Sequence, residues 1–384
     1  MSKCPLHDVA IVGAYNTRQA RRLSETNEPE ILMEAVRGAL SDAGLDMHTV
    51  DGCNITASTW GLHSRQGVTL LGGRPSWTGL EYGIGAVLEA AAAIATGQCE
   101  TVVIATAQVG EYTDRSATAP WTRPSNEFVA SFGLYTAAEF ALIARRHMHL
   151  YGTRPESLAE VASTIRCHGG HNPEAVMTGR FPSPEDVLAS RMVADPFHLL
   201  DCCITSEGGA ALVLTTAERA ADLDTTPIYL LGGATERRGM SYVAAPVWDH
   251  TGWVGEKAAQ TAFEQSGLSP SSVDVAELYD PFSFEIIRQL EAFGFCKHGE
   301  GGDYVMNGRI GIGGELPVAT NGGILAYSHA GLAQLLQKPI AAVQQLRGTV
   351  PDKLRVPDAQ VAIATNGGAG ALFTDVLLLG KESL

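Results

Sequence analysis

The chain has 384 residues, enough for two domains or for two related halves. Hydrophobic residues make up 45% of it and charged residues 18%, which provides apolar surface for large cores and too little charge for a disordered chain. The formal net charge of −15 argues against nucleic-acid binding, which needs lysine and arginine to displace counterions from phosphates.

The N-terminus and the apolar runs predict neither a signal peptide nor a membrane span. The first residues, MSKCPLHDVAIVG, carry one lysine and a short β-like run. Apolar runs such as GAVLEAAAAIATG stop short of the thickness of a bilayer. The seven cysteines are odd in number and lack paired C-x-x-C spacing, which favours reduced thiols over a disulfide framework. We therefore expect a cytoplasmic protein.

A repeated pattern of helix and strand indicates a duplicated α/β half. In residues 32–44, LMEAVRGALSDAG, apolar side chains share one helical face, Gly44 is a natural helix end, and MHTVDGCNI leads into a short strand. The same residue types recur in 258–278 at a constant offset of 223. VVIATA at 102–107 is likewise echoed by VAIATN at 361–366. Solenoid repeats have far shorter periods, so this offset predicts two halves whose mixed or parallel sheets are covered on both faces.

The boundaries of the halves follow from this repeat and from a change in composition. Residues 1–108 and 201–225 are predicted to form the N-terminal half, and residues 226–384 the C-terminal half. Residues 109–200 are rich in charge, proline and aromatic side chains. We predict that they form an insertion with short helices, packed over the first half, where such excursions often shape a substrate pocket.

The stretch AELYDPFSFE, residues 276–285, places polar side chains directly after a predicted buried strand. Tyr279 is an ionisable phenol at the end of that strand, although a tyrosine there is more often a core ring. Asp280 is as well suited to brace a loop, by accepting backbone N–H groups, as to act in chemistry. Phe282 and Phe284 are predicted to lie in the core.

No motif predicts a metal or an organic cofactor. Cys167, His168 and His171 offer three ligands in a predicted loop without a second cluster, so a structural role is favoured over zinc. His147 and His149 are two residues apart on a helix and therefore face different sides. GIGGEL does not follow a strand and open a helix, so it is not a dinucleotide fingerprint.

Together these stretches resemble the thiolase superfamily over almost the whole chain, most closely its sterol-carrier-protein or lipid-transfer branch. The resemblance implies a thiolase fold, with two pseudo-symmetric α/β halves, a mixed five-stranded sheet in each, and α-β-α-β-α layers. The matching stretches are VAIVGAYNT (9–17), GAVLEAAAAIATGQCETVVIATAQ (85–108), RRHMHLYG (145–152), DCCITSEGGAALVL (201–214), ELYDPFSFE (277–285), GGILAYSHAGLAQLLQ (322–337), QQLRG (344–348) and TNGGAGA (365–371).

The departures from the thiolase pattern indicate a different chemistry. The nucleophilic cysteine of a thiolase, at a helix N-terminus, matches Leu80, and its second cysteine matches Asn366. The histidine of the G-H-P motif matches His329, whereas the histidine of H-D-C-F is replaced by Tyr279. Tyr327 precedes His329 in the same loop. This pattern resembles the cysteine-less aldolases of the branch, which use tyrosines to cleave a β-hydroxyacyl-CoA formed on a sterol side chain.

Cleavage of this kind needs a base for the hydroxyl proton, donors for the thioester oxygen and an acid for the α-carbon. The resemblance implies Tyr279 and Tyr327 as the acid–base pair, in an order left open, and His329 as the donor to the thioester oxygen. A phenol, with a reference pKa of about 10, can exchange protons with an alcohol or an enolate. Contacts to the substrate are expected from Leu80, Asp280, Phe282, Gly322, Gly323, Asn366 and Gly367.

The resemblance also implies partners. We expect a homodimer and a small OB-fold protein, possibly zinc-bearing, that completes the acyl-CoA site of a heterotetramer. No compact basic cluster marks a phosphate site, so Arg145, Arg146 or the partner would bind the CoA phosphates.

Two alternatives remain at this stage. The first is an acyl-CoA thiolase or acyltransferase that uses Cys99, although Cys99 follows the helix end at Gly97. The second is a non-catalytic acyl-CoA-binding subunit. The acyl group is open among steroid, bile-acid and aromatic side chains.

Overall fold

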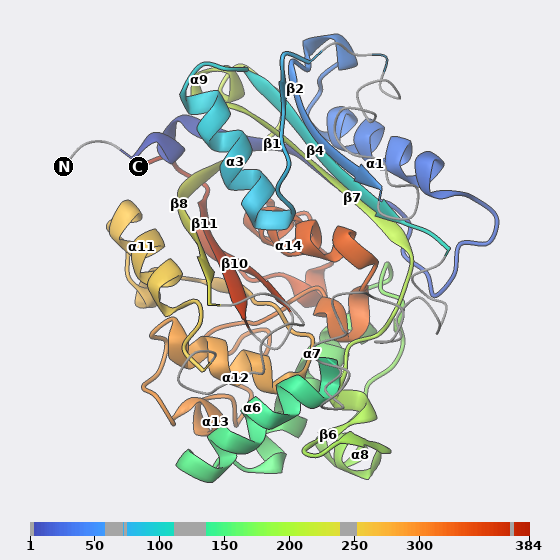
Figure 1. Ribbon diagram of the computed structural model, residues 1–384, viewed down its shortest axis with the longest axis vertical. Coiled ribbons are helices and arrows are strands. Elements are labelled where there is room, and N and C mark those ends of the chain that lie inside the picture. Colours follow the sequence, from blue (N-terminus) through green and yellow to red (C-terminus); the bar gives the residue numbers. More distant parts are fainter. Residues whose placement is uncertain (1–3, 58–71, 73–74, 111–135, 239–251, 369–371) are drawn as a thin grey trace.

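The computed structural model describes residues 4–57, 72, 75–110, 136–238, 252–368 and 372–384. Within these ranges, nine strands form one mixed sheet in the order β3-β2-β4-β7-β1-β8-β11-β10-β9 (Figure 1). Its strands are β1 (Val9–Asn16), β2 (Gly52–Ala57), β3 (Trp77–Thr78), β4 (Thr101–Gln108), β7 (Gly208–Thr216), β8 (Ile228–Arg237), β9 (Val275–Glu277), β10 (Val361–Gly368) and β11 (Phe373–Gly380).

The order of the strands confirms the duplication. The series β2-β4-β7-β1 in the first half is matched by β9-β10-β11-β8 in the second. The helix α1 (Glu28–Asp42) has its counterpart in α11 (Glu256–Ser266), and both bury the apolar residues that recur in the sequence. The first half contributes five strands, as predicted, and its sheet continues into that of the second half. The second half contributes four strands, and β1 pairs with β8 through Ala10–Tyr229 and Ile11–Ile228.

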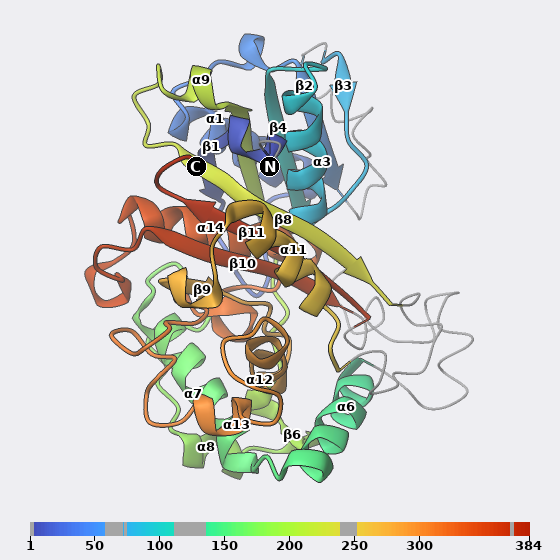
Figure 2. The ribbon, with the colours of Figure 1, turned by 90° about the vertical axis from the view of Figure 1, so that its left-hand side faces the viewer.

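The layers are those expected of a thiolase fold. The helices α3 (Gly83–Ala95) and α14 (Gln334–Arg347) share one apolar core with the inward faces of both halves of the sheet. The helix α1 covers the outer face of the first half, and α11 and α12 (Ser283–Ala292) cover that of the second (Figure 2). This arrangement places the N-terminal ends of α3 and α14 near the ends of β9 and β10.

The insertion differs from its prediction in two ways. The helices α6 (Thr136–Tyr151) and α7 (Pro155–His171) are long, and they pack against α12 of the second half, not over the first half. The reason is that α12 is buried on all sides, so its outward apolar side chains need a further layer. The shorter elements nearby are α8 (Pro184–Ala189), β5 (Met192–Ala194), β6 (Phe197–His198) and α13 (Gly301–Tyr304), while α9 (Ala217–Ala220) follows β7.

Among the described residues, no helix combines the length and the hydrophobicity needed to cross a membrane. His168, predicted in a loop, lies in α7, where it is buried and its Nδ1 is 3.3 Å from the carbonyl of Ala319. His147 is buried and His149 is exposed on α6, as their spacing predicted.

Candidate active site

Tyr279 lies two residues after the end of β9, and hydrogen bonds fix both its backbone N–H and its carbonyl. Its N–H donates to Thr365 Oγ1 over 2.8 Å, and its carbonyl accepts from Gln289 Nε2 over 2.6 Å. The Thr365 hydroxyl donates in turn to Gln289 Oε1, so the three residues form a closed ring. The Tyr279 side chain is 7% exposed and lies against Gly367, where an added Cβ would come within 2.9 Å of the ring. Gly367 therefore makes room for the phenol, a role different from the predicted contact with substrate.

Asp280 joins the loop of Tyr279 to the turn that carries Tyr327. Its carboxylate accepts the N–H groups of Ile324 (3.1 Å) and Leu325 (3.2 Å), within the π-helical turn Gly323–Tyr327. Lys338 on α14 forms an ion pair with the same carboxylate over 2.6 Å, and both side chains are buried. Burial raises the pKa of Asp280, and the charge of Lys338 opposes this shift. The bracing role weighed for Asp280 is thus the one that the structure supports.

The glycines of this turn are needed for close packing. Gly323 has φ of 54°, and an added Cβ would lie 2.0 Å from Asp280 Oδ2. Gly322 has φ of 104°, and its Cβ would lie 2.4 Å from the Cα of Gly169 on α7. Both positions therefore need glycine, because a side chain would clash and would strain the backbone of the turn.

The phenol of Tyr327 is fully enclosed. Burial is the main cause that raises its pKa, the charge of Glu174 adds to the shift, and a hydrogen bond from Asn16 opposes it. Asn16 ends β1, so the phenol lies near the C-terminal end of that strand. A tyrosine with a raised pKa keeps its proton at neutral pH and gives it up only to a strong base such as an enolate carbon.

His329 is oriented by the segment before β7. Its Nδ1 lies 2.9 Å from the carbonyl of Ile204, and its backbone N–H donates to Ser206 Oγ. A carbonyl can only accept, so Nδ1 carries the proton and Nε2 of the neutral ring is an acceptor. Burial lowers the pKa of His329 to about 4, which keeps the ring neutral. In this tautomer Nε2 accepts a hydrogen bond, whereas the sequence predicts that His329 donates one to a thioester oxygen.

The N-terminus of α3, where a thiolase has its nucleophile, is occupied by Asn366. The Asn366 Oδ1 accepts the N–H of Ile84 over 2.7 Å, and its Nδ2 donates to the carbonyls of Leu335 and Thr365. The buried amide thus ties the halves together, and its predicted contact with substrate stays a prediction. Leu80 lies three residues before the helix, and its side chain is 75% exposed.

The cysteines offer no activated thiolate at this position. All seven are free, and burial raises the pKa of Cys99 to about 12. The thiols of Cys53, Cys202 and Cys296 are shifted in the same way to about 12. A thiol that stays protonated is a poor nucleophile, so sulfur chemistry through Cys99 finds no support here.

Phe282 lies in the core, as predicted from its position after the strand. Its ring stacks on Phe197 with centroids 4.9 Å apart and meets Phe140 of α6 at 5.0 Å. The aromatic contacts fix the far end of the loop that begins at Tyr279.

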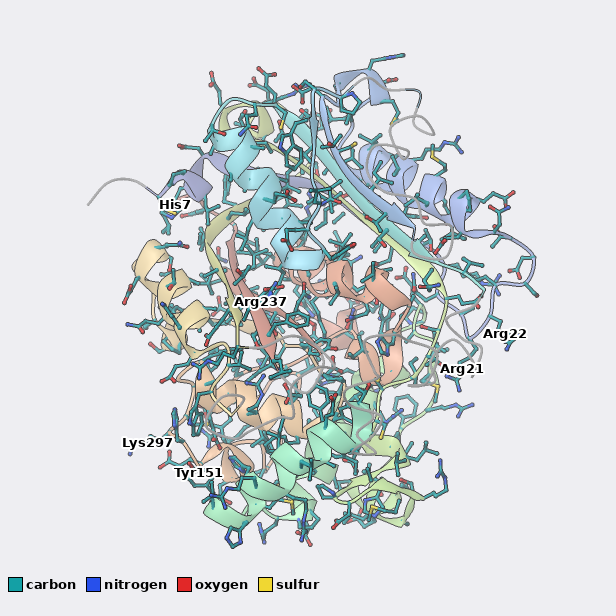
Figure 3. The ribbon with its side chains drawn as sticks, viewed as in Figure 1. His7, Arg21, Arg22, Tyr151, Arg237 and Lys297 are labelled. Atoms are coloured by element: carbon teal, nitrogen blue, oxygen red, sulfur yellow. The ribbon has the colours of Figure 1, made fainter. Side chains whose placement is uncertain are left out.

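The basic side chains labelled in Figure 3 are spread over the molecule. Figure 3 shows Arg21 and Arg22 at one edge of the molecule, Arg237 near its middle and Lys297 at the opposite side. Arg237 is engaged by Asp375. A pocket of about 330 Å³ borders the turn before Tyr327, but no lysine or arginine lines it. Nor do the described residues contain three His, Cys, Asp or Glu side chains grouped to hold a metal.

Sequence reasoning missed three residues that shape this site: Gln289, Thr365 and Lys338. Gln289 and Lys338 lie within helices, where polar side chains usually face solvent, and nothing local marks them as buried. Thr365 could have been predicted from the sequence, because it lies in the predicted strand directly before the glycine run.

Comparison with known proteins shows the family of the chain. Residues 240–381 match the family model described as Thiolase C-terminal domain-like. A steroid side-chain-cleaving aldolase of Thermomonospora curvata is 35% identical, over 98% of this chain and 99% of its own. A 17-hydroxy-3-oxo-4-pregnene-20-carboxyl-CoA lyase of Mycobacterium tuberculosis is 36% identical, over 88% of this chain and 92% of its own.

A solved structure described as an Ltp2-ChsH2(DUF35) aldolase superposes with a TM-score of 0.84 at 33% identity, covering 97% of this chain and 98% of that one. The likeness extends over both halves, so the fold and the sequence give the same assignment. The chain belongs to the thiolase superfamily, in the group that includes the steroid side-chain-cleaving aldolases.

Proposed function

We propose that this chain cleaves the carbon–carbon bond of a β-hydroxyacyl-CoA, with a steroid side chain or a related acyl group, to give a ketone or aldehyde and a shorter acyl-CoA. The observation that carries the proposal is the pairing of two loops. Asp280 and Lys338 hold the loop of Tyr279 against the turn of Tyr327, at a site without an activated cysteine. The relatives named for this activity cover the chain almost end to end.

Retro-aldol cleavage places negative charge on the thioester oxygen and on the α-carbon, and it needs no covalent intermediate. Tyr327 is the acid that protonates the α-carbon, because its raised pKa keeps the phenol protonated until the enolate forms. Tyr279 is the second phenol of the acid–base pair and, as the phenolate, accepts the proton that leaves the β-hydroxyl group. His329 accepts a hydrogen bond at Nε2 and so orients a hydroxyl group, in place of the donor role first expected.

A partner is part of the proposal. The aldolase of similar structure is named together with a DUF35 protein. A partner of this kind, with an OB fold and possibly zinc, would supply the basic groups for the CoA phosphates that the described residues lack. We propose a homodimer that binds two such proteins, in the cytoplasm, where the seven free cysteines would stay reduced.

The test is co-expression with an OB-fold protein encoded nearby, followed by mass analysis of the products from a panel of β-hydroxyacyl-CoAs. The proposal expects a carbonyl compound and a shortened acyl-CoA in equal amounts. If the protein consumes a β-ketoacyl-CoA in place of a β-hydroxyacyl-CoA and transfers the acyl group to free CoA, the thiolase alternative is favoured. Binding of acyl-CoA without turnover, with every partner tried, would favour a non-catalytic subunit.

A further inference from the structure

Four buried polar side chains next to His329 form a network that the scheme above does not use. They come from four separate segments: Gln19 after β1, Ser206 before β7, Ser328 beside His329, and Gln337 on α14. None of the four is more than 8% exposed. A buried polar side chain costs free energy unless hydrogen bonds satisfy it, so four of them at one place need a physical reason.

The backbone around Gln19 is fixed to the segment that leads into β7. Ala20 exchanges two backbone hydrogen bonds with Glu207, of 3.1 and 2.7 Å. An added Cβ on Gly208 would lie 2.2 Å from Gln19 Oε1, so glycine at this position leaves room for the glutamine. The Gln19 side chain therefore enters the network from a fixed backbone.

The orientation of the Gln19 amide follows from its neighbours. Its Nε2 lies 2.7 Å from the carbonyl of Thr17 and 3.2 Å from that of Gly209, and carbonyls only accept. The reversed amide would set an oxygen against these two carbonyl oxygens. Oε1 therefore faces the network, where it accepts from Ser328 Oγ over 2.7 Å and from Gln337 Nε2 over 3.0 Å.

The order of donors and acceptors along the two serines is then determined. A hydroxyl group has one proton, and Ser328 gives its proton to Gln19. Ser206 must therefore be the donor in the 2.9 Å contact between the two serine oxygens. The Ser206 oxygen in turn accepts the backbone N–H of His329 over 2.8 Å. From this N–H through both hydroxyl groups, every hydrogen bond points to Gln19 Oε1, which ends the series.

The segment that contains Ser206 also orients the imidazole ring. Ile204 accepts from His329 Nδ1 over 2.9 Å, and the N–H of Ser206 donates to the carbonyl of His329 over 3.2 Å. The backbone and the ring of His329 are thus held by residues 204–206, whose serine depends on Gln19 for its orientation.

We propose that Gln19 is a positioning residue for the reaction. As the last acceptor of the series, it holds His329 so that Nε2 accepts a hydrogen bond from a hydroxyl group of the substrate. This inference rests on the proposed aldolase function, because it assigns Gln19 a task only through the role of His329 given there.

The first experiment measures cleavage of a β-hydroxyacyl-CoA by wild type, Gln19→Met and Gln19→Glu, each with its partner protein. Methionine is close to glutamine in size but has no acceptor oxygen, so kcat should fall about 10–10²-fold while KM stays within about threefold. In Gln19→Glu a neutral acid can replace the amide, whereas a carboxylate would face two carbonyl oxygens. Its kcat should therefore approach that of wild type at low pH and fall as pH rises.

The matched control is Gln345→Met. This glutamine is also buried on α14, but its amide donates to Thr320 Oγ1 and to the carbonyl of Leu354, outside the network. Its loss should lower stability without changing kcat.

The second experiment observes the His329 ring by ¹⁵N NMR of histidine-labelled protein, with its signals assigned by their loss in His329→Gln. Wild type should show a protonated Nδ1 and an unprotonated Nε2, as the contact with Ile204 requires. In Gln19→Met the proton should be shared between both nitrogens, and the pKa of the ring should rise from about 4 towards its ordinary value. Gln345→Met should show the wild-type signals.

The outcomes are distinguishable. If Gln19→Met folds and leaves either the ring signals unchanged or kcat within about threefold of wild type, the inference is overturned, although the protein is still an aldolase. If Gln19→Met does not fold, Gln19→Glu decides, because a kcat that does not fall with rising pH would overturn the inference. If wild type cleaves no β-hydroxyacyl-CoA with any partner, the proposed function itself fails, and the ring signals alone decide whether Gln19 positions His329.

Discussion

Replacement of Lys338 by methionine should be among the most damaging single changes on α14. The Lys338 ammonium is 2.6 Å from Asp280, and neither side chain is more than 2% exposed. Removal of one partner from a buried pair leaves an uncompensated charge and costs about 3–5 kcal/mol. Since Asp280 also accepts the N–H groups of Ile324 and Leu325, the change should loosen the turn that positions Tyr327.

The assay is urea unfolding of wild type, Lys338→Met, Asp280→Asn and the double variant, followed as a double-mutant cycle. Lys338→Met should lose about 3–5 kcal/mol of unfolding free energy, and the double variant should lose less than the sum of the single changes, because the neutral pair leaves no unpaired charge. Turnover of the surviving Lys338→Met protein should fall through kcat, with KM little changed. A cost below about 1 kcal/mol, or strict additivity, would refute the view that this pair holds the two loops together.

Two further predictions concern the backbone of the turn and the titration of Glu139, a buried residue of α6. Gly323→Ala should lower both the urea midpoint and kcat, since the added Cβ would lie 2.0 Å from Asp280 Oδ2 and the residue has a φ of 54°. The control is Gly44→Ala, at the end of a helix, which should lower stability without changing kcat. Because the pKa of Glu139 is raised from 4.5 to about 7, the folded state holds a proton that the unfolded state releases, and stability should fall as pH rises through this window. The loss is up to about 3 kcal/mol by pH 8 and should be absent in Glu139→Gln; an equal pH dependence of unfolding in both proteins would contradict the raised pKa.

The sequence carried enough local information for the fold. Helical periodicity around Ala35 and Ala258 predicted α1 and α11, because the spacing of apolar residues is a property of the segment itself. The side on which the insertion packs was predicted wrongly, since it depends on α12, whose own helical pattern does not reveal that every face of it is covered.

In the candidate site, too, the sequence predicted what depends on local motifs and missed what depends on distant contacts. Tyr279, Tyr327 and His329 were predicted from their motifs, and their roles remain predictions that the experiments above address. The His329 tautomer could not be predicted, because it depends on the carbonyl of Ile204, 125 positions away.

The central claim is that protons pass through phenols and that no acyl group is held on sulfur. The most direct test is turnover of the Tyr279→Phe/Tyr327→Phe variant beside Cys99→Ala, each with the partner protein and with its folding confirmed by thermal unfolding. We predict that loss of both phenols abolishes cleavage and that loss of the thiol leaves it intact. Cleavage that survives without the phenols but stops without Cys99 would contradict the claim.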